Sequence, residues 1–162
     1  MKKICVILIM TVLLTGCSSE ETLETVCDEW LQPVMATPRH ISVQLPEEVA
    51  APVMESDTEQ IYVSDHYELI LETCASGDLN ATVHHMSGYE KDRLTILQTG
   101  LDGCERYAFV WAAAGEQGER LGRAVILDDG QYHYCLSVLQ DADSETVGAI
   151  DWNAVFGSFR LA

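Results

Sequence analysis

The feature that most constrains the fold is a run of four strand-like segments separated by short turns that contain glycine. Segments rich in β-branched and aromatic residues that alternate with such turns are typical of consecutive β-strands. The run therefore predicts an antiparallel meander in the C-terminal half of the chain. Its strands are expected at 94–99, 105–112, 121–127 and 132–139.

The turn between the last two of these strands contains Asp129-Gly130, the strongest hairpin signal in the sequence. An Asp-Gly pair between strands favours a type I′ turn, which needs positive φ at both central positions. Asp128 and Asp129 also form a pair of carboxylates, but neighbouring residues on a strand point to opposite faces. We therefore interpret them as part of the hairpin rather than as a catalytic pair. Gly115 and Gly118 are likewise interpreted as turn glycines.

Helices and further strands complete the expected domain. Strands are predicted at 41–45, 61–64 and 67–73. Asp78 is a suitable N-cap for a short helix that Gly88 would end. Asp151 would cap a closing helix whose aromatic stripe has the 3.6-residue period of a buried face. The sequence thus predicts an α+β fold in which helices cover an antiparallel sheet. The stripe consists of Trp152, Val155, Phe156 and Phe159.

The N-terminus has the layout of a secretory signal. Lys2 and Lys3 precede an apolar stretch at 4–14, which is shorter than the roughly 20 residues that a membrane-spanning helix needs. Leu14-Thr15-Gly16-Cys17 follows and resembles the bacterial lipoprotein processing box. The resemblance implies that 1–16 is removed and that Cys17 receives a diacylglyceryl group on its sulfur. The alternative is an ordinary secretory signal that happens to end in a cysteine.

Residues 17–40 are expected to form a lipid-anchored N-terminal segment with an amphipathic helix that begins near Ser18. Its polar side is acidic, whereas helices that lie on membranes usually carry Lys and Arg. Pro33 would end or kink the helix near Leu31. We therefore expect this helix to pack on its own domain, which is predicted to be a single α+β unit at 41–162.

The charge of the chain limits its partners. The net charge is −17 at pH 7, and loss of Lys2 and Lys3 with the leader would make it more negative. Such a charge argues against nucleic acid and against broad contact with anionic lipid. A cationic peptide, a metal ion or a basic protein patch would be attracted. Solubility alone also explains an acidic surface, and we favour that interpretation.

Four cysteines remain after Cys5 is removed with the leader and Cys17 is modified. An exported protein can form disulfides, but the spacing matches no dense disulfide framework and no Cys-x-x-Cys motif. Buried free thiols are also common, because cysteine packs as a small hydrophobic residue. The sequence leaves pairing open. The four are Cys27, Cys74, Cys104 and Cys135.

The C-terminal part resembles a known group of proteins. The stretch "GCERYAFVWAAAGEQGERLGRAVILDDGQYHYCLSVLQDAD", followed by "WNAVFGSFRL", is similar to small uncharacterised lipoproteins of Gram-positive anaerobes. Their architecture resembles the PsbP-like α-β-α sandwich, and the resemblance covers about residues 41–162. It implies a binding or assembly module and no particular reaction. The matching positions are Tyr107, Phe109, Trp111, Ser158 and Phe159.

His133 and Cys135 are the strongest candidates for chemistry, because they lie on the same face of one predicted strand. With Cys74 or His66 as a further ligand they could hold zinc, or His133 could activate the thiol as a nucleophile. Strand geometry separates the pair by roughly 7 Å, which is too far for a direct hydrogen bond. We therefore favour a structural pair, a buried cysteine beside a surface histidine, and expect Cys135 to react slowly. His84-His85 diverge around a helix and are not expected to share a metal.

The expected function is that of a lipid-anchored extracytoplasmic binding or assembly module without catalytic activity or cofactor, held at the outer face of the cell membrane. Tyr and Trp favour contact with proteins and glycans. The anticipated partners are therefore the membrane, through Cys17, and an envelope protein or a glycan, but not nucleic acid. The alternatives are a metal-binding or thiol-dependent enzyme that uses His133 and Cys135, and a structural envelope protein. The candidate binding surface is Tyr107, Phe109, Trp111, Tyr132 and Tyr134.

Overall fold

The computed structural model describes residues 36–45, 47, 49, 51–115, 118–142 and 150–162. These residues belong to one compact unit, Ala36–Ala162. None of the helices in these ranges is both long enough and apolar enough to cross a membrane. The leader, Cys17, Cys27 and the predicted helix near Ser18 lie outside the described residues.

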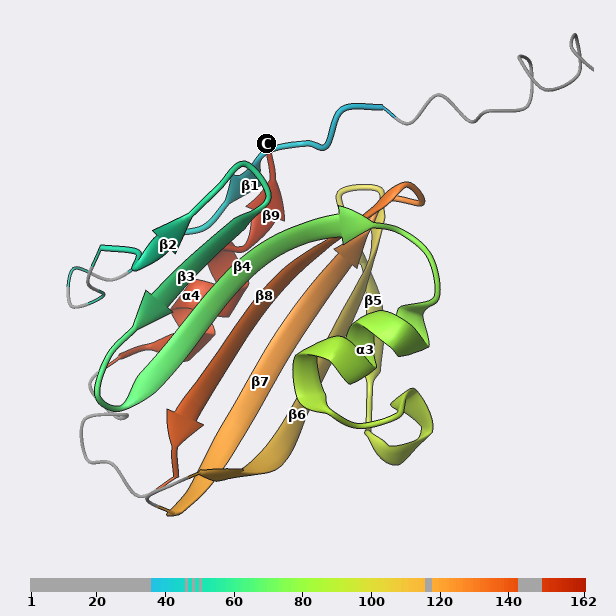
Figure 1. Ribbon diagram of the computed structural model, residues 1–162. Helices are drawn as coiled ribbons and strands as arrows, with labels where there is room; N and C mark the ends of the chain where they lie inside the picture. Colours follow the sequence, from blue (N-terminus) through green and yellow to red (C-terminus); the bar gives the residue numbers. More distant parts are fainter. Residues whose placement is uncertain (1–35, 46, 48, 50, 116–117, 143–149) are drawn as a thin grey trace, which may run out of the picture. The chain divides into compact units, whose positions relative to one another are not determined.

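A seven-stranded antiparallel sheet forms the framework of the unit (Figure 1). Its order is β2-β3-β4-β8-β7-β6-β5, so the C-terminal hairpin inserts beside β4 and joins the two halves of the sheet. A separate two-stranded ribbon pairs β1 with β9 and brings the start of the unit to the C-terminus. The strands are β1 (Ile41–Ser42), β2 (Met54–Glu55), β3 (Glu59–Val63), β4 (Tyr67–Ala75), β5 (Leu97–Leu101), β6 (Cys104–Gly115), β7 (Gly118–Asp128), β8 (Tyr132–Asp141) and β9 (Arg160–Leu161).

Helix α3 (Leu79–Ser87) covers one face of the sheet. The Asp78 side chain accepts a hydrogen bond from the Asn80 amide, and Gly88 ends the helix in the left-handed conformation with φ of 75°. Both caps were predicted from the sequence and are confirmed. Val83 is a fully buried residue of this helix and belongs to a core cluster with residues from β6, β7 and β8. The 3₁₀ turn η1 (Lys91–Arg93) follows it.

Helix α4 (Trp152–Ser158) covers the opposite face, where the larger core lies (Figure 1). Asp151 caps it as predicted, since its side chain accepts a hydrogen bond from the Ala154 amide. The expected aromatic stripe is buried. Trp152 meets Tyr67 edge-on, with ring centroids 5.3 Å apart. The fold is therefore α+β, with one helix on each face of an antiparallel sheet.

Strands β7 and β8 show why the sequence requires cover on both faces. Val125 and Leu127 face the α4 core, while Ala124 and Ile126 face the α3 core, and all four side chains are buried. A strand that is covered on both sides carries a continuous apolar run instead of alternating apolar and polar residues. Strand β4, the third strand of the sheet, differs, because it alternates and places Leu69 in the α4 core and Glu68 on the other face.

The predicted meander is confirmed as β5 to β8, with bounds that differ at several ends. The first strand begins at Leu97 instead of Leu94, because η1 and its following residues occupy the preceding stretch. The expected strand at 41–45 is only Ile41–Ser42, where it pairs with β9. Strands β2 and β9 were not predicted, since two residues show no periodicity.

The prediction of a type I′ turn at Asp129-Gly130 is wrong. Gly130 has φ of 88°, but Asp129 does not have positive φ. The Asp129 carboxylate instead accepts hydrogen bonds from the Gln131 and Tyr132 amides, at 2.9 and 2.8 Å. These side-chain hydrogen bonds determine the conformation of the turn. Positive φ at two consecutive positions occurs at Asp102 and Gly103, with 52° and 82°, between β5 and β6. That Asp-Gly pair has the backbone that a type I′ turn requires.

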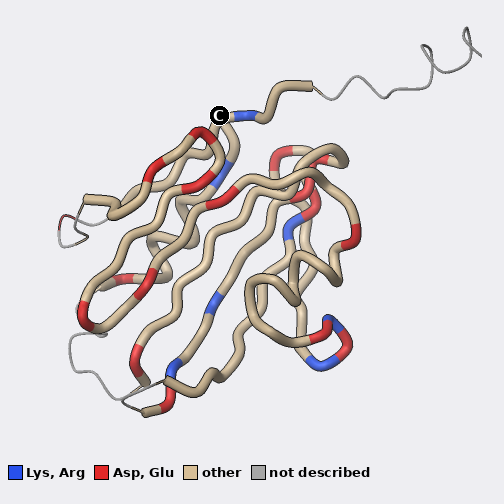
Figure 2. The backbone as a smooth tube through the Cα atoms, in the orientation of Figure 1, with Lys and Arg blue, Asp and Glu red and all other residues tan. Residues whose placement is uncertain are grey.

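Acidic residues are more frequent than Lys and Arg along the backbone of this unit (Figure 2). Many of them lie at loops and strand ends, whereas the few cationic residues are scattered along the chain. Electrostatics alone therefore marks no extended site for a polyanion on the described residues.

Candidate binding pocket and thiol–imidazole cluster

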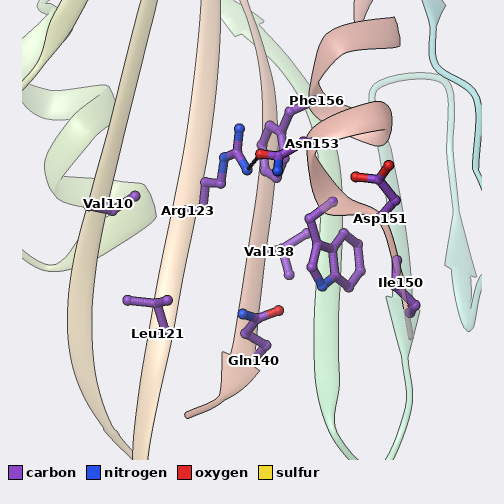
Figure 3. Close-up of a pocket in the computed structure, with 10 residues that line it drawn as sticks. Val110, Leu121, Arg123, Val138, Gln140, Ile150, Asp151, Asn153 and Phe156 are labelled. Atoms are coloured by element: carbon purple, nitrogen blue, oxygen red, sulfur yellow. Dashed lines mark hydrogen bonds between the residues drawn. The ribbon is translucent and has the colours of Figure 1, made fainter. Parts of the chain in front are cut away.

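A pocket of about 550 Å³ lies between α4 and strands β6, β7 and β8 (Figure 3). Ligand sites for small molecules commonly have volumes of roughly 300–1,000 Å³. The pocket is therefore large enough for a small organic ligand. It is lined by Val110, Leu121, Arg123, Val138, Gln140, Ile150, Asp151, Trp152, Asn153 and Phe156.

The floor of the pocket follows from the strand register. Arg123 is paired with Val110 on one side and with Val138 on the other, so these three side chains form a row across the sheet. Leu121 is paired with Gln140 and forms the next row on the same face. The floor is therefore mainly apolar, with Arg123 and Gln140 as its polar members.

The pocket exists because α4 covers only part of this sheet face. The helix has seven residues, which corresponds to a length of about 10 Å. Beyond it, the side chains of Val110 and Leu121 are 57% and 44% exposed. Among the described residues, the outer part of the apolar floor is thus left open to solvent.

Two buried polar atoms at the pocket have no hydrogen-bond partner among the described residues. They are Nε1 of Trp152 and Oε1 of Gln140, one a donor and the other an acceptor. A buried polar group without a partner costs roughly 1–3 kcal/mol. Both atoms are closed to a water-sized probe, so a ligand would bond to them only after a rotation of the Trp152 or Gln140 side chain, and such a ligand would recover this free energy.

Arg123 supplies a half-buried cation at the same place. Its guanidinium lies 4.3 Å from the centre of the Phe156 ring, and its Nη1 donates to Asn153 Oδ1 at 2.8 Å (Figure 3). Burial, together with Arg106, lowers the pKa of Arg123, but arginine remains charged at neutral pH. Within the described ranges no carboxylate oxygen lies within 4 Å of this guanidinium. Its charge is therefore available to an anion.

A second cluster of reactive groups lies on the α3 face, around His133. His133 is a buried residue with 0% exposure, so the prediction that it is a surface histidine is wrong. Its Nδ1 lies 2.8 Å from Thr82 Oγ1 on α3. Its Nε2 lies 3.3 Å from Ser76 Oγ and 3.5 Å from Asp128 Oδ2. Both ring nitrogens therefore have polar partners.

Cys74 is the thiol that faces this imidazole. Cys74 and His133 are direct neighbours across β4 and β8, and Cys135 is the diagonal neighbour on the same face. Hydrogen bonds with Cys135 and His133 lower the pKa of the half-buried Cys74 to about 4. Contact with Cys74 raises the pKa of His133 against the opposing effect of burial. The lowered pKa of Cys74 and the raised pKa of His133 agree with a thiolate–imidazolium pair.

Cys135 has the opposite character. It is completely buried, as the sequence predicted, and contact with Cys74 together with burial raises its pKa well above the usual range. The sequence analysis paired His133 with Cys135 because both lie on one strand. The structure instead gives His133 a cross-strand thiol, Cys74, from a segment 59 residues earlier in the chain.

The other predicted histidines lie apart from this cluster. His66 precedes the opposite end of β4 and lies 3.5 Å from Asp141. His84 and His85 contact different carboxylates, those of Glu90 and Glu72. Among the described residues, no group of three or more His, Cys, Asp or Glu side chains is arranged to hold a metal ion. Cys74, Cys104 and Cys135 are free thiols.

The five aromatic residues predicted as a binding surface do not share one exposed surface. Tyr107, Phe109 and Trp111 belong to the α3 face, and Tyr132 and Tyr134 belong to the α4 face. Phe109, Trp111 and Tyr134 are buried, and the other two are half-buried. A helix on each face covers them, so they contribute mainly to the two cores.

The pocket residues were missed by the sequence analysis, which assigned Trp152 and Phe156 to the core alone. One signal was present. Arg123 interrupts an otherwise apolar strand on the face that the α4 aromatics cover. A cation at such a position needs a compensating contact, and this would have pointed to the site.

Comparison with protein-family models finds no match for this chain, and comparison with curated proteins finds no significant match either. The chemistry open to the protein follows from the pocket and from the thiol–imidazole cluster. The pocket combines an apolar floor with one cation and two buried polar atoms, which suits binding. The cluster combines two thiols with an imidazole, which suits sulfur chemistry.

Proposed function

We propose that this protein is a lipid-anchored extracytoplasmic binding module that holds a small amphipathic anion in the pocket beneath α4. The pocket would take an aromatic or aliphatic body of a few rings or carbons, bearing one carboxylate or sulfonate group. Its fold would be a variant of the PsbP-like α-β-α sandwich, in line with the helix on each sheet face. The tether at Cys17 would keep the module at the outer face of the cell membrane.

The observation that carries this proposal is the pair of buried polar atoms without described partners, Trp152 Nε1 and Gln140 Oε1. Both belong to residues that line an apolar pocket. Apolar walls with a few polar groups are the usual composition of small-molecule sites, in which the polar groups fix orientation.

The charge of the ligand follows from Arg123. Its guanidinium is in contact with a neutral amide oxygen and an aromatic ring, and neither neutralises it. A carboxylate or sulfonate can accept charge-assisted hydrogen bonds, which are roughly twice as strong as neutral ones. The apolar floor around Val110 and Leu121 would contact the body of the ligand.

The test uses the full chain and the fluorescent probe 8-anilinonaphthalene-1-sulfonate, an aromatic body with one sulfonate. We expect saturable binding with one probe per chain. Arg123→Gln should weaken binding by about tenfold or more, because the loss of a charge-assisted contact costs roughly 1.5–3 kcal/mol. Trp152→Phe keeps an aromatic ring but removes the N–H donor, and it should weaken binding less.

Arg93→Gln is the matched control, since it removes one exposed arginine on η1, away from the pocket. Circular dichroism and the urea midpoint of each variant would establish that the fold is retained. Equal probe affinity in the wild type, Arg123→Gln and Arg93→Gln would contradict the proposal, because binding would then not involve the pocket.

The anchor is tested separately with Cys17→Ser. Two acyl chains are enough to hold a protein stably at a membrane. The Cys17→Ser variant has no thiol to carry these chains, so it should lose the anchor. We expect the wild type in the membrane pellet and Cys17→Ser in the soluble fraction after cell fractionation. A variant that remains in the pellet would contradict the lipid anchor but would leave the pocket proposal standing.

A further inference from the structure

We propose that Cys74 and Cys135 form a dithiol site that reduces small disulfides, with Cys74 as the attacking thiol and Cys135 as the resolving thiol. The site lies on the α3 face and is independent of the pocket proposed for ligand binding. Its substrate class is an accessible disulfide of low molecular weight. Oxidation would link the two strands that carry the cysteines, β4 and β8.

Three geometric features support the assignment. The strand register places Cys74 opposite His133 and diagonal to Cys135, so all three side chains share one face of the sheet. Diagonal neighbours in antiparallel strands lie roughly 7–8 Å apart, and the Cys74 thiol is a hydrogen-bonding neighbour of the Cys135 thiol, so a bond between the two sulfurs would draw β4 and β8 closer together at this point. His133 is fixed by Thr82 on one side and by Ser76 and Asp128 on the other. The imidazole is therefore held beside the thiol by polar contacts on both sides of its ring.

The two thiols also differ as an attacking and a resolving cysteine should. Cys74 is half-buried and reachable from solvent, whereas Cys135 is 0% exposed. The pKa of Cys74 is lowered to about 4, mainly by contact with Cys135 and His133. The pKa of Cys135 is raised. Because the thiolate is the nucleophile, an external disulfide would react with Cys74 first.

The first step consumes the thiolate of Cys74. Its sulfur attacks one sulfur of a disulfide R–S–S–R, the S–S bond breaks, and RS⁻ leaves. A mixed disulfide, Cys74–S–S–R, remains. The imidazolium of His133 then no longer faces a thiolate, so the main cause of its raised pKa is removed. It releases its proton, and the first RS⁻ departs as RSH.

The second step forms the protein disulfide. The sulfur of Cys135 attacks Cys74 Sγ, the S–S bond of the mixed disulfide breaks, and the second RS⁻ leaves and takes up the Cys135 proton to become RSH. Loss of the Cys74 thiolate favours this step, because contact with Cys74 was the largest cause of the raised Cys135 pKa. Two electrons pass from the two cysteines to the external disulfide. The products are one Cys74–Cys135 disulfide and two RSH.

In the test, the full chain is incubated with glutathione disulfide. Thiol exchange is then stopped with acid, free thiols are alkylated, and the tryptic peptides are identified by mass. The positions of Lys and Arg place Cys74 in peptide 40–91, Cys104 in 94–106 and Cys135 in 124–160. We expect a disulfide-linked pair of peptides 40–91 and 124–160. Peptide 94–106 should carry only the alkylated thiol.

Two variants separate the steps. Cys135→Ala should stop at the mixed disulfide, with glutathione on peptide 40–91, because the resolving thiol is absent. Cys74→Ala should leave Cys135 free of glutathione. The wild-type protein alone decides the main point, so failure of a variant to fold would not remove the test.

The pH profile of Cys74 alkylation tests the role of His133. An ordinary thiol with a pKa of about 8.5 loses on the order of 100-fold in rate between pH 8.5 and pH 6. The Cys74 rate should change less than about threefold over this range. His133→Gln should slow Cys74 at pH 6 by about tenfold or more and have little effect at pH 9. The matched control His66→Gln should leave the profile unchanged.

The proposal would be overturned by a wild-type protein in which peptides 40–91 and 124–160 never become linked. It would also be overturned if Cys74 alkylation followed the profile of an ordinary thiol. Neither outcome bears on probe binding beneath α4, so a failure of the dithiol proposal can be distinguished from a failure of the proposed function.

Discussion

The two faces of the sheet use the same strands for different purposes. The α4 face carries the larger core, in which buried aromatic and aliphatic side chains surround Phe156 and Phe159. The α3 face has a smaller apolar core around Val83, and beside it lie two buried polar residues, Thr82 and His133. The α4 face is therefore stabilised mainly by apolar burial, while the α3 face combines packing with a polar network.

The difference shows how one hairpin separates two chemistries. Adjacent residues of a strand point to opposite faces, so Tyr134 joins the α4 core while its neighbours His133 and Cys135 join the α3 cluster. The sheet itself keeps the proposed pocket and the dithiol site apart. Substitutions on one face should therefore affect one site without altering the other.

The largest expected effect is on the α4 face. Phe156→Ala should lower the free energy of unfolding by about 3–5 kcal/mol, because it removes a buried aromatic ring and leaves a cavity. It also removes the ring that the Arg123 guanidinium contacts. Urea unfolding followed by circular dichroism would measure the loss.

Val83→Ala is the matched truncation on the α3 face. Val83 is fully buried, and full burial of a valine side chain contributes roughly 1.5–3 kcal/mol. Val83→Ala should therefore lower the free energy of unfolding by less than Phe156→Ala does. If Val83→Ala proved as destabilising as Phe156→Ala, the α3 face would be as important for stability as the α4 face, and the comparison would fail.

A second effect is expected on the α3 face at Gly122. This glycine is paired with Trp111, and a Cβ atom at position 122 would overlap the indole ring. Gly122→Ala should cost about 1–3 kcal/mol by overpacking and should change the near-UV circular dichroism of Trp111. Gly100→Ala is the control, since nothing lies within 4 Å of its added Cβ. Equal stability of Gly122→Ala and wild type would show that Trp111 moves without cost.

Local features of the fold could be predicted from the sequence. The helix caps at Asp78 and Asp151 and the glycine stop at Gly88 depend on a few neighbouring residues. The meander was recognised because its turns and apolar runs lie close together in the chain. The type I′ turn was assigned to the wrong Asp-Gly pair, because side-chain hydrogen bonds of Asp129 decide that turn and no dipeptide pattern reveals them.

Non-local features could not be predicted. The partner of His133 is Cys74, which becomes its neighbour only because β8 inserts beside β4. Periodicity places His133 and Cys135 on one face but does not identify the strand that lies next to them. The pocket likewise depends on how far α4 extends over the sheet, and this is decided by packing rather than by any local pattern.

Substitution of Gly130 tests the turn between β7 and β8, the two strands that contribute side chains to both faces of the sheet. The φ of 88° at Gly130 is disfavoured for residues with a side chain, so Gly130→Val should cost roughly 1–3 kcal/mol of backbone strain. No atom lies within 4 Å of the added Cβ, so the cost would be conformational rather than steric. Gly77→Val is the control, because its surroundings are equally open and its φ is not in the positive region. An unchanged melting midpoint in Gly130→Val would show that the turn can adopt another backbone.

The smallest effect concerns the two neighbouring aspartates of this hairpin. Asp128 contacts His133 on the α3 face, whereas Asp129 accepts a hydrogen bond from the Tyr134 hydroxyl on the α4 face at 2.9 Å. Burial alone would raise the pKa of Asp129, but hydrogen bonds from the Gln131 and Tyr132 amides and from Tyr134 outweigh it and lower the pKa.

A lowered pKa in the folded state gives Asp129 a contribution to stability that is present above its unfolded pKa, near 3.9. This contribution is lost as the pH falls through the lower folded pKa. Asp129→Asn should therefore be less stable than wild type at pH 7, and the difference between their urea midpoints should shrink toward pH 3. Asp92→Asn, at an exposed position on η1, should show no such change. A difference that stays constant with pH would mean that the turn needs only the shape of Asp129, and that its charge does not stabilise the α4 face.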